Sequence, residues 1–89
     1  MGEYQIVFAR SARKELEALP ARLAERVLRR IECLSATPRP RGCRKLSGKE
    51  HLWRLRVGEQ RVLYAIDDTR RLVDVIAIRH RRDAYRLGG

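Results

Sequence analysis

Residues 51–85 read HLWRLRVGEQRVLYAIDDTRRLVDVIAIRHRRDAY, and this basic stretch decides the fold. It contains three strand-like runs, at 51–57, 61–67 and 72–79, joined by short polar turns. Such short connections predict antiparallel hairpins, because parallel strands need a long crossover. The third run is apolar on both faces, which predicts an internal position in the sheet.

The first run places its charged and apolar residues on opposite faces. Side chains in a strand alternate between the two faces, so Arg54 and Arg56 share one face while Trp53 and Leu55 share the other. The same alternation assigns Tyr64 to the core together with Trp53. The sequence therefore predicts a sheet with one basic face.

The N-terminal third combines a strand with a helical hairpin. Residues 3–8 alternate as a strand does, whereas apolar residues recur every three or four positions from Ser11 onward. Proline fits only the first turn of a helix. Pro20 therefore predicts two helices, at about 11–18 and 20–36.

Together these elements predict an α+β fold. The N-terminal strand and the three-stranded antiparallel meander form a four-stranded sheet, and the helical hairpin covers one face of it. A short tail with one or two helical turns follows from His80 to Leu87. The 89 residues have room for one core, so we expect a single domain over 1–89.

The chain is strongly basic, with 21 Lys and Arg against 11 Asp and Glu and a formal net charge of +10. This excess favours a polyanionic partner, and nucleic acid is the leading candidate. No apolar run is long enough to cross a bilayer, and the chain does not begin with a secretory signal. We therefore expect a cytoplasmic protein without a membrane partner.

A basic loop lies between the helical hairpin and the meander. Two prolines at alternate positions in residues 37–42 exclude a regular helix. The loop and the residues after it carry five cations that we interpret as an RNA-binding surface: Arg39, Arg41, Arg44, Lys45 and Lys49. A solubilising loop is the alternative for each of them.

The sequence contains no recognisable metal or cofactor site. Cys33, Cys43, His51 and His80 lack the paired spacing of a zinc site. The basic face also lacks a carboxylate pair for two-metal chemistry and a Ser-His-Asp or Cys-His nucleophile. We therefore expect no cofactor, and any reaction at phosphate has to be independent of metal.

RNA can supply its own nucleophile for such a reaction. The protein must deprotonate the 2′-hydroxyl, stabilise the additional negative charge on phosphorus and protonate the leaving 5′-oxygen. Guanidinium groups suit the second task, and those of Arg54, Arg56 and Arg81 would also favour the phenolate form of a nearby tyrosine. Tyr85 is the tyrosine that follows these residues and is the candidate base.

Two blocks of this stretch resemble a known family. The R-V-x-x-x-R-V-x-Y block runs from Arg56 to Tyr64, and the H-R-R-D-x-Y block runs from His80 to Tyr85. With the upstream strand and the helical hairpin broken at Pro20, they are similar to the RelE branch of the RelE/ParE superfamily of bacterial and archaeal type II toxins. The resemblance implies cleavage of messenger RNA in the ribosomal A site and neutralisation by a cognate antitoxin protein.

The resemblance also implies roles for single residues. Arg61 and Arg81 match family arginines that contact phosphate, and Tyr85 matches the tyrosine proposed as general base. Arg54 and Arg56 stand where well-known RelE members carry lysines, so their implied role is to stabilise charge. Arginine gives up a proton reluctantly. The alternative candidate for protonating the leaving group is therefore His80, because histidine is the residue type suited to proton transfer near neutral pH.

The same residues allow other interpretations. A toxin of ParE type would inhibit DNA gyrase on this fold without nuclease activity, and a plain nucleic-acid-binding module would bind without turnover. Arg61 and Arg81 could instead be structural, paired with one of three carboxylates: Asp67, Asp68 or Asp83. Tyr85 could instead cap the core with its hydroxyl in water.

The outer face of the helical hairpin carries mixed charges. Pairs such as Glu25 with Arg29 are spaced as on a solvated helix surface, and we interpret the face in that way. A nucleic-acid footprint that extends onto Arg29 and Arg30 is the alternative.

Overall fold

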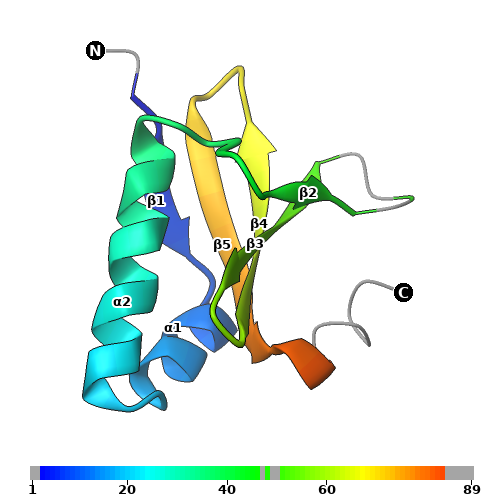
Figure 1. The fold of residues 1–89 in the computed structure, drawn as a ribbon. Helices are drawn as coiled ribbons and strands as arrows, with labels where there is room; N and C mark the ends of the chain where they lie inside the picture. The colour runs from blue at the N-terminus through cyan, green and yellow to red at the C-terminus, as the bar shows by residue number, and fades with distance from the viewer. Residues whose placement is uncertain (1–2, 47, 49–50, 84–89) are drawn as a thin grey trace.

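The computed structural model describes residues 3–46, 48 and 51–83. Its elements are β1 (Gln5–Phe8), α1 (Arg10–Glu17), α2 (Ala21–Glu32), the 3-10 helix η1 (Cys33–Ser35), β2 (Arg44–Lys45), β3 (Leu52–Val57), β4 (Gln60–Asp67) and β5 (Leu72–His80). Both α-helices lie on one side of the sheet (Figure 1). The predicted α+β architecture with its helical hairpin is confirmed.

The strands form one sheet in the order β1-β5-β4-β3-β2. β1 runs parallel to β5, whereas the pairs further along the sheet are antiparallel. β5 is internal, as its two apolar faces predicted. The sheet has one strand more than the predicted four, because Arg44 and Lys45 pair with Arg54 and Trp53 of β3. A two-residue strand has too little alternation to be recognised in a sequence.

Pro20 separates the two helices as predicted. It is the N-cap of α2, with a φ of −54°. The second helix was predicted to reach residue 36; its α-helical part ends at Glu32 and one 3-10 turn continues to Ser35. The Ser35 hydroxyl donates to the Tyr4 carbonyl, at 2.8 Å, which ties this turn to the strand side of the molecule.

The predicted helical tail is described only in part. Residues 81–83 are helical, and residues 84–87 lie outside the described residues. No helix within the described part of the chain combines the length and the apolar character that crossing a bilayer demands.

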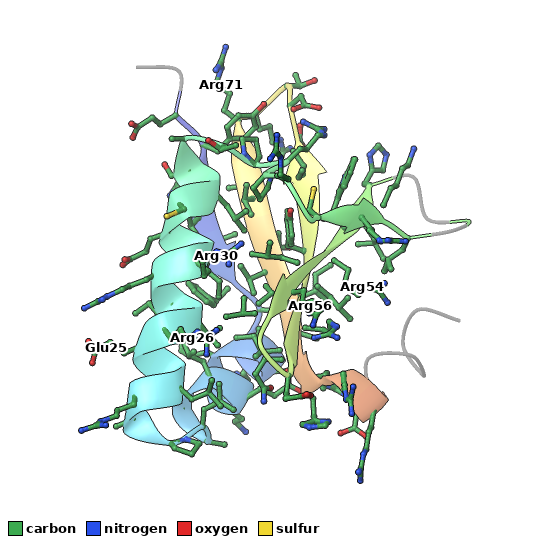
Figure 2. The ribbon with its side chains drawn as sticks, in the orientation of Figure 1. Glu25, Arg26, Arg30, Arg54, Arg56 and Arg71 are labelled. Atoms are coloured by element: carbon green, nitrogen blue, oxygen red, sulfur yellow. The ribbon has the colours of Figure 1, made fainter. Side chains whose placement is uncertain are left out.

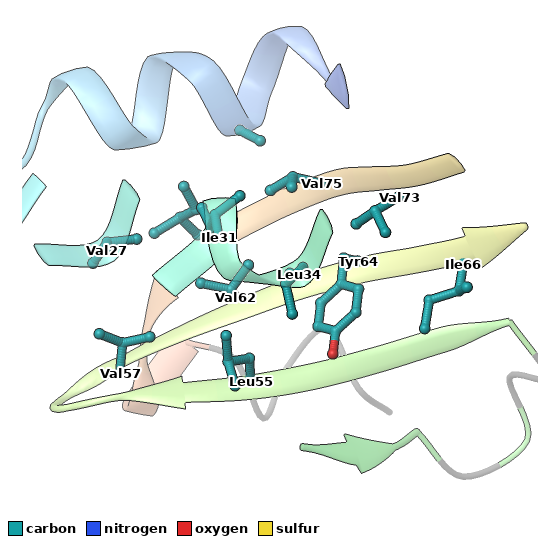
Figure 3. Close-up of a cluster of buried hydrophobic side chains, with 12 residues drawn as sticks. Val27, Ile31, Leu34, Leu55, Val57, Val62, Tyr64, Ile66, Val73 and Val75 are labelled. Atoms are coloured by element: carbon teal, nitrogen blue, oxygen red, sulfur yellow. The ribbon is translucent and has the colours of Figure 1, made fainter. Parts of the chain in front are cut away.

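The main core fills the space between α2 and the sheet (Figure 3). Val27 and Ile31 of α2 are fully buried, and so is Tyr64 of β4. The Tyr64 hydroxyl donates to the Pro38 carbonyl, at 2.8 Å, so its burial leaves no unsatisfied polar group. Burial is the largest cause that raises the pKa of Tyr64. Trp53 packs against the same core, so the assignment of both aromatic residues to the core is confirmed.

Helix α1 covers the part of β5 that extends beyond β1. β1 pairs with β5 as far as Val75, and side chains of α1 bond to the strand after that point. Ser11 Oγ donates to the Ile76 carbonyl at 3.3 Å, and Glu15 Oε1 accepts a hydrogen bond from the Ile78 N–H at 2.8 Å. Because exposed strand edges invite unwanted pairing, α1 protects the sheet here.

Candidate phosphate-binding site

Three arginines lie in a row across the sheet. The strand register pairs Arg56 of β3 with Arg61 of β4, and Arg61 with Arg79 of β5. Residues directly opposite one another in antiparallel strands point to the same face. The neighbouring residues Leu55 and Val62 belong to the core under α2, so the arginine row starts on the other face. The predicted basic face is therefore present.

Arg61 is the most buried member of this row, with 9% of its surface exposed. Its Nη1 donates to the carbonyl oxygens of Gly58, at 2.9 Å, and Gln60, at 3.0 Å. Within the described residues it forms no ion pair, including none with the three aspartates that the sequence offered as structural partners. A largely buried cation without a counter-ion is costly. The position therefore favours binding of an anion.

Arg79 and Arg81 each contact a carboxylate. Arg79 forms an ion pair with Glu15 of α1, and Arg81 Nε lies 3.1 Å from Glu59 Oε2. The Arg81 N–H also donates to the Glu59 carbonyl, at 2.8 Å, which holds Arg81 beside the start of β4. The Arg81 and Glu59 side chains are 54% and 57% exposed, and ion pairs at such exposure contribute little. A phosphate could therefore replace Glu59 at small cost.

A groove of about 640 Å³ follows the edge of β3, bordered by α2, the end of the 37–43 loop and β2. Its lining is almost entirely basic: Arg30, Arg41, Gly42, Arg44, Arg54, Leu55, Arg56 and Arg61. In the described part of the chain no acidic residue lines it. Grooves lined by one sign of charge between low-dielectric walls raise the local concentration of counter-charged ligands. The groove is therefore suited to a polyanion.

Most groove arginines have no carboxylate partner among the described residues, a property that they share with five exposed arginines elsewhere: Arg10, Arg13, Arg22, Arg26 and Arg82. Five arginines outside the groove have carboxylate partners: Arg29 with Glu25, Arg39 with Asp68, Arg70 with Asp67, Arg79 with Glu15 and Arg81 with Glu59. Of the groove arginines, Arg30, Arg41, Arg44 and Arg56 form no ion pair with any described residue. Uncompensated like charges destabilise a folded chain. Their concentration in one groove is typical of a binding site.

Arg30 is a groove residue for which the sequence allowed two interpretations, a solvated surface and an extended nucleic-acid footprint. Arg29 and Arg30 were interpreted together as solvated surface. The structure confirms this for Arg29, which lies 3.1 Å from Glu25. Arg30 lies on the side of α2 that faces β3, together with Arg26, while Glu25 points away (Figure 2). The sequence contained one signal that separates the two arginines. Glu25 and Arg29 are four residues apart and can form an ion pair, whereas Arg30 lies on a neighbouring side of the helix.

Some predicted residues are not brought into the groove. Tyr85 and Lys49 lie outside the described residues. Lys45 is exposed and pairs in register with Trp53, whereas Arg44 pairs with Arg54. Consecutive strand residues point to opposite faces, so Arg44 joins the groove and Lys45 does not.

His80 also lies apart from the arginine row. It pairs in register with Gln60, next to the pair of Arg61 and Arg79, so alternation directs it to the opposite face of the sheet. Its Nδ1 accepts a hydrogen bond from the Arg82 N–H, at 3.3 Å. The register therefore gives no support to His80 as a proton donor at Arg61.

Arg39 belongs to a separate cluster. Its guanidinium donates to both carboxylate oxygens of Asp68, at 3.2 and 2.8 Å, and lies over the Trp53 ring, 5.1 Å from the centroid. The Tyr4 hydroxyl donates to Asp68 Oδ1, at 2.6 Å. These hydrogen bonds lower the pKa of the Asp68 carboxyl to about 2, and the bond from Arg39 has the largest effect. Arg39 thus anchors the basic loop, and the groove is lined by Arg41 instead.

The groove offers guanidinium groups and little else as ligand-binding atoms. Over residues 3–46, 48 and 51–83, no group of three or more His, Cys, Asp or Glu side chains is placed to hold a metal ion. Cys33 and Cys43 are free thiols. Guanidinium groups bind phosphate oxygens through paired N–H donors, so the arrangement is suited to hold phosphate and to stabilise additional charge on it.

Comparisons with known proteins show which family and which fold this chain resembles. Residues 6–85 match the family described as the ParE toxin of type II toxin–antitoxin systems. A search among curated proteins gives no match. The fold is similar to a chain of the RelBE toxin–antitoxin complex from Mycobacterium tuberculosis, with 30% identity and a TM-score of 0.79 over 88% of this chain and 98% of that one.

Two further solved structures have the same fold. A chain of the RelE-RelB complex from Pyrococcus horikoshii is 26% identical, with a TM-score of 0.79 over 89% of this chain and 96% of that one. A variant of the E. coli toxin RelE in the free state is 21% identical, with a TM-score of 0.79 over 93% and 88% of the two chains. At this level of identity, the similarity to the E. coli toxin shows a shared fold alone.

Proposed function

The chain belongs to the RelE/ParE superfamily of type II toxins, and we propose that it is a metal-independent endoribonuclease that cleaves messenger RNA in the ribosomal A site. The observation that carries the proposal is Arg61, which is nearly buried and held by two backbone carbonyls. It lies in a groove whose described lining contains six arginines and no acidic residue. A phosphodiester supplies the anion that such a site lacks.

In the proposed reaction the RNA 2′-oxygen attacks the adjacent phosphorus and the bond to the 5′-oxygen breaks. The products are a 2′,3′-cyclic phosphate and a 5′-hydroxyl end. Arg61 and its register partner Arg56 bind the non-bridging oxygens, where charge increases in the transition state. Donors that are already fixed in place stabilise such charge without reorganisation, and the carbonyls of Gly58 and Gln60 fix Arg61 in this way.

The remaining roles follow from the resemblance. Tyr85 takes the proton of the 2′-hydroxyl, because a field of uncompensated arginines favours the phenolate form of a tyrosine. Arg81 exchanges Glu59 for the phosphate and becomes a second clamp. Arg54 lines the same groove and adds to the field. Arginine is a poor proton donor near neutral pH, so no groove arginine is assigned to the leaving 5′-oxygen, which takes its proton from water.

An antitoxin protein is the proposed cellular partner. The solved structures from Mycobacterium tuberculosis and Pyrococcus horikoshii are toxin–antitoxin complexes, and we extend that arrangement to this chain. The proposed site of action of the toxin itself is the ribosome in the cytoplasm.

Inhibition of DNA gyrase without nuclease activity is the second candidate function. The match of residues 6–85 to a family described as ParE toxin favours it. It gives no role to a largely buried arginine that has no carboxylate partner among the described residues, which is why we place it second. Persistent gyrase-linked DNA breaks in the absence of RNA cleavage would favour it over the nuclease.

A translation reaction with purified ribosomes and a defined message tests the nuclease. The parent protein should cleave the message, and Arg61→Ala should reduce the rate roughly 100-fold to 1000-fold, because it removes a fixed donor to the transition state. Arg70→Ala is the matched control, since Arg70 pairs with Asp67 outside the groove. Thermal unfolding followed by circular dichroism checks that both variants fold. A message left intact by the parent at high concentration contradicts the proposal.

A further inference from the structure

We propose that α2 provides a second phosphate-binding position in the groove, with Arg30 as its contact to the RNA strand. The inference rests on the proposed function, because it assumes that the reactive phosphate lies at Arg56 and Arg61. A neighbouring phosphate of the same strand is then held from the opposite wall by Arg30. The loop residue Arg41 lines the groove beside it.

The packing of α2 fixes the direction of Arg30. Val27 and Ile31 are fully buried in the core, which sets the rotation of the helix against the sheet. Each helical residue is turned by about 100° from the previous one, so residues 26 and 30 lie beside the buried stripe. Figure 2 shows both arginines on the side toward β3. Arg30 is thus held over the groove by the core, although its own side chain is exposed.

Contact with the β3–β4 turn confirms that this side of α2 reaches the strands. A Cβ atom placed on Gly58 would lie 3.5 Å from Arg26 Nη1. The carbonyl of the same glycine accepts the hydrogen bond of Arg61, at 2.9 Å. Arg26 and Arg61 therefore both approach the β3–β4 turn. The helix and the strands form two walls of one site.

The charge pattern of α2 is unfavourable for a merely solvated surface. Glu25 and Arg29 are four residues apart and form an ion pair of opposite charges. Arg26 and Arg30 have the same spacing and equal charges, which destabilises a helix by a few tenths of a kcal/mol. Arg26 and Arg30 lie on the side of α2 toward β3, whereas Glu25 points away from it. An anion bound between the two guanidinium groups would remove this repulsion.

The shape of the groove favours a strand over a single phosphate ion. It measures about 640 Å³, and its arginines come from α2, the loop at Arg41, β2, β3 and β4. Contacts from arginine to phosphate position a nucleic acid and carry no base information. The second position should therefore strengthen binding of every RNA sequence equally and set the strand in place for the reactive phosphate.

Binding of a short single-stranded RNA with 2′-O-methyl groups tests this inference, because such RNA cannot supply the attacking hydroxyl. Fluorescence anisotropy measures the affinity of the parent, Arg30→Gln, Arg30→Lys and the control Arg29→Gln over a range of salt concentrations. Arg30→Gln should weaken binding roughly tenfold at low salt. It should also lower the slope of log K against log salt by about 0.7, the value for one phosphate contact on a single strand.

The variants distinguish a specific phosphate contact of Arg30 from a general effect of net charge on RNA binding. Arg30→Lys should keep the salt slope because it keeps the charge, and Arg29→Gln should leave both affinity and slope near those of the parent. Equal losses for Arg29→Gln and Arg30→Gln, an unchanged slope for Arg30→Gln, or a parent that binds no RNA at low salt would each overturn the inference. An altered slope combined with no message cleavage by the parent would leave the second position standing and remove the nuclease.

Discussion

At the scale of single residues, Glu15 joins two parts of the fold. Its Oε1 accepts the hydrogen bond of the Ile78 N–H at 2.8 Å, and its Oε2 forms the ion pair with Arg79. The Glu15 side chain is only 24% exposed. Its removal would leave a strand amide and a guanidinium without their acceptor, and such groups are expensive when water cannot reach them fully.

We expect Glu15→Ala to lower the free energy of unfolding by about 1–3 kcal/mol, measured by urea denaturation. Glu15→Gln keeps an oxygen for the Ile78 N–H and loses the charge, so its effect should be smaller. Glu17→Ala, at an exposed position of the same helix, is the control. Equal stabilities of the variants at positions 15 and 17 would show that the contacts to β5 contribute nothing.

At the scale of elements, Asp68 connects three segments that are distant in the sequence. It lies in the β4–β5 turn and bonds to Tyr4, before β1, and to Arg39, in the basic loop. The hydrogen bond from Arg39 has the largest effect and that from Tyr4 the second largest, and together they lower the pKa of Asp68 from 3.8 to about 2. The loop that carries Arg41 into the groove is therefore anchored by an ionised carboxylate.

The stabilising effect of Asp68 should depend on pH in a defined direction. A carboxyl with a lowered pKa in the folded state contributes stability above its ordinary pKa and loses that contribution as the pH falls through its folded value. The difference in unfolding free energy between the parent and Asp68→Asn should be constant above about pH 5 and should decrease progressively as the pH falls to 2. Urea denaturation at several pH values measures it. A difference that persists unchanged at pH 2 would contradict the ionic role.

The elements also show what the sequence could and could not predict. Strands β3, β4 and β5 and the break at Pro20 were predictable, because alternation and proline chemistry act locally. Strand β2 was not, since its two residues become a strand only through pairing with β3. For Arg30 the sequence left two interpretations open, because the side of α2 that faces β3 depends on how the helix is rotated on the sheet. Tyr85 stays a prediction.

At the scale of the whole molecule, the charge is distributed unevenly. The formal net charge is +10, and five of the arginines outside the groove are neutralised by carboxylates. The groove collects uncompensated arginines from both the helical side and the strand side of the fold. Functional sites commonly retain such unfavourable charge because binding needs it, at a cost in stability. The free protein should therefore gain stability when one groove charge is removed.

Arg44 is the residue with which to test whether a groove charge lowers the stability of the free protein. It is exposed on the short edge strand β2, lines the groove and forms no ion pair with a described residue. We expect Arg44→Gln to raise the free energy of unfolding by a few tenths of a kcal/mol in low salt, because repulsion within the groove decreases. The gain should vanish in roughly 1 M salt, where the screening length is about 3 Å. Urea is the denaturant to use, since it is uncharged.

Arg29→Gln is the matched control, because it removes the same charge from a compensated pair. It should lower the stability in low salt by about 0.3–0.5 kcal/mol, the usual contribution of such a helical pair. The two substitutions change the net charge equally, so opposite signs can arise only from where the charge lies. The same Arg44→Gln protein should bind RNA more weakly than the parent. If both variants change the free energy of unfolding in the same direction, the repulsion arises from the net charge of the whole molecule. That result would contradict a specific repulsion within the groove.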